Sequence, residues 1–147
     1  MRLLLRHSDW WDRLPADDRQ MLHELGGVHG VVVAWLEQQL TEYGPLTWAA
    51  LDPAMQGQEW CAEARRWVNA AAPDEEQAFD DLRRVIHRLW VADLEAHAQA
   101  VITQGHLGRE QLDQIGALRE QIKAHKQAEL VLSIRATAAD INLSRYN

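Results

Sequence analysis

Histidine, acidic and cysteine side chains in this sequence have spacings that could bind a metal ion, but each candidate set is incomplete. His23-Glu24 resembles the first half of the zinc-protease motif HExxH, but the position of the second histidine is taken by Gly27. Asp93 and His97 are four residues apart and share one face of a helix, but no third ligand follows at helical spacing. We therefore expect no metal site and no cofactor, and a stability that does not depend on bound metal.

Candidates for nucleophilic, proton-transfer or phosphate chemistry are also incomplete. Cys61 is the only cysteine; it lies among apolar helical positions with no histidine nearby in sequence, which is typical of a buried, unreactive thiol. His87 lies in the middle of a predicted long helix, where a histidine at the edge of the core is a simpler interpretation than a proton shuttle. The glycines of residues 26–30 follow a helix and lack the Lys-Ser/Thr of a phosphate loop. The sequence thus predicts no catalytic constellation.

Length, charge and hydropathy limit the class of protein. The chain has 147 residues and a formal net charge of −7. It is long enough for one domain, or for one domain with a small appendage. Because strong binding to nucleic acid needs a basic surface, this acidity argues against it. The longest uncharged apolar run is far shorter than the roughly 20 residues that span a bilayer, and no signal peptide is apparent. We expect a soluble, cytoplasmic protein with no membrane association.

The spacing of apolar residues predicts an all-α fold. All four prolines lie at or before position 73, and together with glycines they divide the first half into six short helical segments. These predicted segments are residues 1–14, 18–25, 31–43, 48–51, a turn around position 55, and 58–70. The residues expected to be buried on apolar helix faces here and in the next helix are Trp35, Leu36, Trp67, Leu82, Ile86 and Leu89.

The second half predicts a helical hairpin. Apolar residues keep a three/four spacing for about 28 residues after Pro73, which corresponds to a helix of about 40 Å. Glycines at 105 and 108 end it, and a second helix over 109–129 carries a coiled-coil-like seam. Because the two helices cover only each other, we expect seam residues such as Leu112, Leu118 and Ile122 to be only partly buried. Residues 130–147 have no steady period and predict either an extension of this helix or a disordered tail.

Two stretches resemble the C-terminal, helicase-binding domain of bacterial replicative DNA primases (DnaG type). Residues 30–51 (GVVVAWLEQQLTEYGPLTWAAL) look like the middle of that domain, where a helix ends in a Gly-Pro-Leu-like turn before a short helix. Residues 103–123 (TQGHLGREQLDQIGALREQIK) are similar to its terminal hairpin. The resemblance covers about residues 1–127. It departs from the family at both ends, because the sequence begins inside the first bundle helix and continues past the usual terminus.

The resemblance implies a helical bundle like the N-terminal domain of the replicative helicase, followed by a protruding hairpin. The expected divisions are a bundle over 1–95, a helicase-docking hairpin over 96–129 and a tail over 130–147, possibly disordered. The zinc-binding and RNA-synthesising domains of such primases lie upstream of the matched region. This chain is therefore expected not to be an enzyme, although the primase that it resembles is a DNA-directed RNA polymerase.

The implied function is a protein-interaction module of the primosome, which binds the hexameric replicative helicase and couples primer synthesis to the replication fork. The tail of single-stranded DNA-binding protein is a second implied partner, whereas strong direct binding to nucleic acid is not expected. The implied helicase-binding residues are Leu107, Arg109, Leu112, Ile115, Leu118, Arg119, Ile122 and Lys123.

Two other classes of function stay open. One is a helical, nucleic-acid-associated regulatory protein unrelated to primase, and the acidity of the chain argues against it. The other is a small enzyme with a metal site inside a helical bundle, for which the sequence offers no ligand set. The regulatory protein would use Arg65, Arg66, Arg83, Arg84 and Arg88.

Overall fold

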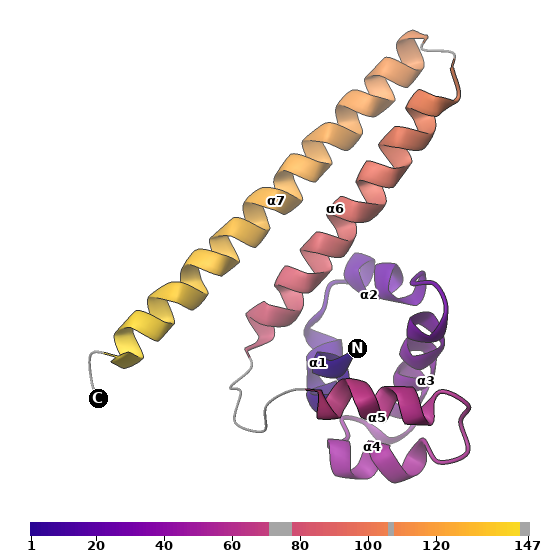
Figure 1. Ribbon diagram of the computed structural model, residues 1–147, viewed down its shortest axis with the longest axis vertical. Helices are drawn as coiled ribbons and strands as arrows, with labels where there is room; N and C mark the ends of the chain where they lie inside the picture. Colours follow the sequence, from indigo (N-terminus) through magenta and orange to yellow (C-terminus); the bar gives the residue numbers. More distant parts are fainter. Residues whose placement is uncertain (71–77, 106–107, 145–147) are drawn as a thin grey trace. The chain divides into compact units, whose positions relative to one another are not determined.

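A computed structural model describes residues 1–70, 78–105 and 108–144 of the protein (Figure 1). Over these ranges the chain is all-α, with seven α-helices, one 3-10 helix and no strand, which confirms the predicted fold class. In none of these ranges is a helix both long enough and apolar enough to cross a membrane. The elements in chain order are α1 (Arg2–Arg6), the 3-10 helix η1 (Ser8–Arg13), α2 (Ala16–His23), α3 (Val28–Tyr43), α4 (Trp48–Ala54), α5 (Cys61–Asn69), α6 (Phe79–Thr103) and α7 (Arg109–Ser144).

The chain forms two compact units, Met1–Gln77 and Ala78–Asn147. The sequence-based division placed the boundary between bundle and hairpin after position 95, whereas the units divide after Gln77. Position 95 is inside α6, which runs unbroken from Phe79 and packs along α7 within the second unit. Because the first turns of α6 pair with α7 just as its later turns do, the whole helix belongs with the hairpin.

In the first unit, α3 begins three residues before its predicted start. It follows Gly27, whose φ of 64° is in the left-handed region, and it ends at Gly44, with φ of 75°. Gly30 lies in the first turn of α3. A Cβ at this position would lie 2.3 Å from the carbonyl oxygen of Leu25. The close approach of α3 to the preceding loop therefore requires glycine here.

Other helix boundaries in the first unit also differ from prediction. The predicted helix over 1–14 is interrupted at His7, which has φ of −129° and separates α1 from η1. Pro53 was expected to open a new turn, but it lies inside α4, one residue before that helix ends. α5 begins at Cys61 instead of position 58, after a turn that contains Gly57 with φ of 93°.

A core of apolar side chains from α1, α3 and α5 stabilises the first unit. Trp35 meets Trp60 edge-on, with ring centroids 5.1 Å apart. The expectation for Leu36 was right, since it is fully buried, but Trp35 and Trp67 are only half-buried. An indole is long enough to pack on the core with one edge while the rest stays in solvent. The buried residues of this core are Leu5, Val32, Met55, Trp60, Cys61, Ala64 and Val68.

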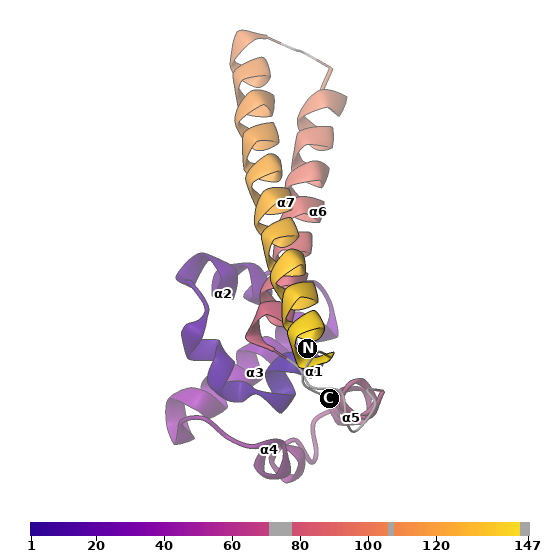
Figure 2. The same ribbon diagram turned by 90° about the vertical axis from the view of Figure 1, so that its left-hand side faces the viewer.

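The second unit is the predicted hairpin: α6 and α7 lie side by side along their length (Figures 1 and 2). Leu82 and Ile86 of α6 are buried as predicted, whereas Leu89 is half-buried. Of the two possibilities left open for residues 130–147, the extension is found, because α7 continues past position 129 through residue 144. α7 is 36 residues long, which is about 54 Å. Its continuation is stabilised by Leu132, which is buried and extends the seam.

The seam of α7 follows a heptad repeat. Ile115, Leu118 and Leu132 are buried, and Ile122 and His125 between them are half-buried, so successive positions are three, four, three and then seven residues apart. Leu118 is only 6% exposed, so the expectation that it is partly buried was wrong. α6 alone is sufficient to cover it.

Leu112 does not belong to this seam, although it was expected there. The heptad spacing that includes positions 115 and 118 continues backwards to Gln111, which is half-buried. Leu112 is the next residue along and is therefore turned about 100° away, with 55% of its surface exposed.

Candidate functional site: the α6–α7 hairpin

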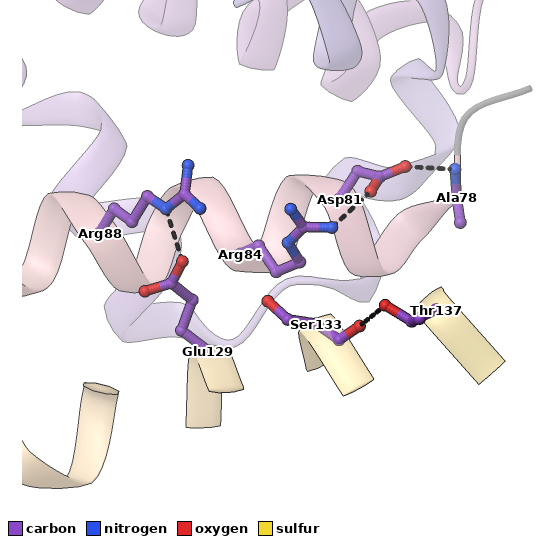
Figure 3. A network of polar contacts seen from close by, with 7 residues as sticks. All are labelled: Ala78, Asp81, Arg84, Arg88, Glu129, Ser133 and Thr137. Carbon is purple, nitrogen blue, oxygen red and sulfur yellow. Dashed lines mark hydrogen bonds and ion pairs between the residues drawn. The ribbon is translucent and has the colours of Figure 1, made fainter. Parts of the chain in front are cut away.

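Two ion pairs between facing side chains join α6 and α7. Arg88 Nε lies 2.6 Å from Glu129 Oε1 (Figure 3), and Lys126 Nζ lies 2.9 Å from Glu95 Oε1. All four side chains are at least partly exposed, so each pair contributes about 0.2–1 kcal/mol and mainly helps to define the antiparallel register.

Asp81, an acidic residue in the first turn of α6, caps the N-terminus of this helix. The backbone N–H of Ala78 donates to Asp81 Oδ2 at 2.9 Å, and Arg84 Nη1 lies 3.4 Å from the other carboxylate oxygen (Figure 3). This carboxylate satisfies a helix N-terminal donor and faces the positive end of the dipole. Asp81 is therefore part of the N-terminal cap of α6.

Further along the seam, two histidines from opposite helices lie in hydrogen-bond contact. His87 Nδ1 and His125 Nδ1 are 2.9 Å apart. The ring of Trp90 stacks on that of His125, with centroids 5.4 Å apart and an interplanar angle of 12°. The sequence did not predict this pair, because the two histidines are 38 residues apart and their pairing depends on the register of the hairpin. The available signal was that both fall on the inner faces of the predicted helices.

The other candidates for metal chemistry have structural roles or are exposed. His23 Nε2 lies 2.7 Å from Glu37 Oε2, and its ring meets Trp11 edge-on. Cys61 is a buried free thiol. Asp93 and His97 are exposed on α6. Among the residues that the structure describes, no three or more His, Cys, Asp or Glu side chains are grouped so that they could hold a metal ion.

The apolar residues implied in docking fall into three environments. Ile115 and Leu118 are buried, so neither is available to a partner while the hairpin is closed. Ile122 is half-buried and Leu112 is exposed. Leu107 lies outside the described residues.

The implied cationic residues share the exposed face of Leu112. Arg109, Arg119 and Lys123 are all exposed. With Leu112 they follow the spacing i, i+3, i+10, i+14, which places them within about 80° of one another around an ideal helix. This cationic face is turned about 120° from the seam that packs on α6.

The last third of α7 carries exposed apolar residues on the side away from its seam. Leu130, Ile134 and Ile141 are each more than half exposed and follow the spacing i, i+4, i+11. They continue the direction of the cationic face along the same helix. A shallow depression here is lined by Ser133, Ile134, Thr137, Ala138 and Ile141.

The arginines of the alternative function do not form one free basic surface. Arg65 Nε donates to Asp52 Oδ1 at 2.5 Å, and this carboxylate raises the pKa of Arg65. Arg84 and Arg88 pair with carboxylates of the hairpin. Arg66 is exposed and Arg83 is half-buried. With three of the five cations neutralised locally, the geometry offers little support for a phosphate-binding site.

Comparisons with protein-family models, with curated proteins and with solved structures find no match to this chain.

Proposed function

We propose that this chain is a protein-interaction module that binds the hexameric replicative helicase through the outward face of α7. It would serve as the C-terminal domain of a primase, couple primer synthesis to the fork, and have no catalytic activity of its own. The proposal rests on the resemblance of residues 30–51 and 103–123 to that domain, and the tail of single-stranded DNA-binding protein is retained as a second proposed partner.

The observation that best supports this proposal is the exposed face of α7. In a two-helix unit each helix is covered on one side only, so its other side is open to a third helix or to a groove. Here that side presents Leu112, 55% exposed, among Arg109, Arg119 and Lys123. An apolar anchor with cations around it suits a partner helix that carries an apolar residue and carboxylates.

The burial of Leu118 changes how the proposal should be tested. A charge at this position would open the α6–α7 seam, so loss of binding would report unfolding as well as docking. Removing the chain from residue 104 onward has the same fault, because it would uncover the buried Leu94 and Val101 of α6. Leu112 is the better site, since its side chain does not belong to the seam.

The experiment measures the dissociation constant for the replicative helicase by isothermal titration calorimetry, with the full chain and with its Leu112→Glu variant. We expect Leu112→Glu to weaken binding at least tenfold while the melting temperature stays within about 2 °C of wild type. The matched control is Val85→Glu, which places the same charge at an exposed apolar position of α6 and should bind like wild type. Wild-type affinity in Leu112→Glu would show that the docking surface lies elsewhere.

A further inference from the structure

The last third of α7 carries a second heptad row, on the side of the helix that faces away from α6. The residues of this row, which we call the outer row, are Leu130, Ile134, Thr137 and Ile141. They are four, three and four residues apart, which is the spacing of a coiled-coil seam. All four are exposed, and the three aliphatic side chains are between 54% and 60% exposed. Leu132, which is buried in the seam with α6, lies on the opposite side, so α6 leaves the outer row uncovered.

The outer row contains both parts of a knobs-into-holes contact. In such a contact one side chain inserts into a hole formed by four residues of the facing helix. The shallow depression on α7 offers such a hole, because its lining includes four residues at positions i, i+3, i+4 and i+7: Ile134, Thr137, Ala138 and Ile141. Ile134 is also 60% exposed, so its side chain can serve as the knob for a second helix.

We propose that the outer row binds the same row of a second copy of this chain, as an antiparallel pair of α7 helices. The two-fold axis would pass between positions 135 and 136. In this register Ile134 of each copy enters the depression of the other opposite Thr137, and Leu130 lies opposite Ile141. The contact is isologous, so one surface supplies knob and hole to both copies. This inference concerns self-association and does not rest on the proposed function.

The composition of this segment suits burial against a copy of itself. The hydroxyl of Thr137 donates to the carbonyl oxygen of Ser133 at 3.1 Å (Figure 3). Because this bond lies within the helix, the hydroxyl donor stays satisfied when a second helix covers it. Residues 130–141 contain two charged residues, Arg135 and Asp140, which have opposite signs and positions outside the outer row. Pairing of the rows therefore covers apolar groups and a satisfied hydroxyl, and no charged residue of the row.

Charge farther along α7 favours the antiparallel direction. A parallel pair would place the exposed Arg119 and Lys123 of one copy beside the same residues of the other, where like charges repel. In the antiparallel pair the two Lys123 residues are about 25 helical positions apart, which is about 38 Å. This exceeds the Debye length of about 8 Å at physiological salt, so their repulsion is screened. The cationic face then stays open to another partner, although a partner that extends along α7 to the outer row would displace the second copy.

The length of the outer row predicts a weak, reversible dimer. Residues 130–141 correspond to about 17 Å of helix. Stable interfaces bury roughly 1,200–2,000 Å², and two helices in contact over about three turns bury less than this. We therefore expect exchange between monomer and dimer, with a dissociation constant on the order of 100 μM.

Sedimentation velocity of the full chain, at concentrations from about 10 μM to about 1 mM, tests the dimer. We expect the weight-average sedimentation coefficient to rise with concentration from the monomer value toward the dimer value. Ile134→Glu would put a carboxylate into the apolar depression of the second copy and should lower the association constant about tenfold or more. The matched control is Val85→Glu, which places the same charge at an exposed apolar position of α6 and should associate like wild type.

A charge exchange tests the register. Leu130→Lys and Ile141→Glu should each weaken association, because each places a charge opposite an aliphatic side chain. The double variant should associate more strongly than either single variant, since each lysine then faces a glutamate of the second copy. Within one chain the two positions are about 17 Å apart along the helix, so recovery would report a contact between copies. In a parallel pair each charge would meet its own kind, and the double variant would associate least.

Four outcomes would overturn the proposal. The first is a wild-type chain that stays monomeric at every concentration, and the second is an equal loss of association in Ile134→Glu and Val85→Glu. A double variant without recovery would exclude the antiparallel register. Species larger than a dimer would indicate a head-to-tail contact in place of the two-fold pair. If instead Ile134→Glu melts at a lower temperature than wild type and sediments like it, the outer row packs within its own chain.

Discussion

Replacing Leu118 with alanine should separate the contribution of the hairpin seam from that of the exposed side of α7. Leu118 is 6% exposed and packs between the two helices, whereas Leu112, two turns earlier on α7, is 55% exposed. The two substitutions remove the same atoms from the same helix, so their difference measures burial. Helix propensity changes equally in both cases, because alanine favours the helix slightly at either position.

The structure places the expected cost of Leu118→Ala in the lower half of the usual range. Removal of a buried leucine side chain costs about 2–5 kcal/mol, and the cost is smaller where neighbours can collapse into the space. Three contacts give the register of the antiparallel helices: His87 faces His125, Arg88 faces Glu129, and Glu95 faces Lys126. The same register places Leu118 opposite the last turns of α6. With few elements around it, this site can relax. We therefore expect about 2–3 kcal/mol, against less than about 0.5 kcal/mol for Leu112→Ala.

Hydrogen exchange of the full chain at pH 7.5 reports this difference unit by unit. A loss of 2–3 kcal/mol corresponds to a fall in protection of about 30- to 150-fold, since 1.4 kcal/mol is tenfold. The fall should appear in α6 and α7 and be absent from amides of the first unit. Equal effects of Leu118→Ala and Leu112→Ala would refute the assignment of the seam, because both positions would then be equally buried or equally exposed.

Two further predictions concern stability and can be measured by chemical denaturation. Ser8 is 2% exposed; its hydroxyl donates to the carbonyl oxygen of Leu46 at 2.5 Å and accepts from the N–H of the same residue at 2.9 Å, so Ser8→Ala should cost about 1–3 kcal/mol. An unchanged midpoint would mean that water replaces both bonds. Gly30→Ala should destabilise the first unit because the new Cβ meets the Leu25 carbonyl oxygen at 2.3 Å, whereas Gly116→Ala, with open space around it in α7, should stabilise the hairpin by about 0.5–1 kcal/mol. Effects of the same sign at the two glycines would contradict this account.

The hairpin could be predicted from sequence because its signal is long and periodic. Many turns of three/four spacing, a glycine break and a second periodic segment admit few arrangements other than two antiparallel helices. The short helices of the first unit gave weaker signals. The break at His7 and the early start of α3 depend on how the chain packs, as the contact of Gly30 with Leu25 shows.

The details of the candidate site could not be read from one helix at a time. Leu112, Ile115 and Leu118 are spaced by threes, and this spacing does not show which of them faces α6 until the register of both helices is known. The His87–His125 contact depends on the same register. A hydrophobic pattern indicates which residues favour burial, but the packing of α6 against α7 determines which of them are buried.

The ambiguity of residues 130–144 has a physical origin that bears on function. In this stretch Leu132 is buried in the seam, while Leu130, Ile134 and Ile141 are exposed on the other side, so apolar residues occur around much of the helix and no single period dominates. The loop-proximal part of the same outward side carries Arg109, Arg119 and Lys123. A partner lying along α7 would thus meet charge near the loop and apolar surface toward the C-terminal end. Charges act mainly on encounter and register, and apolar burial acts mainly on lifetime, so in the docking that we propose the two halves of this face would act at different steps.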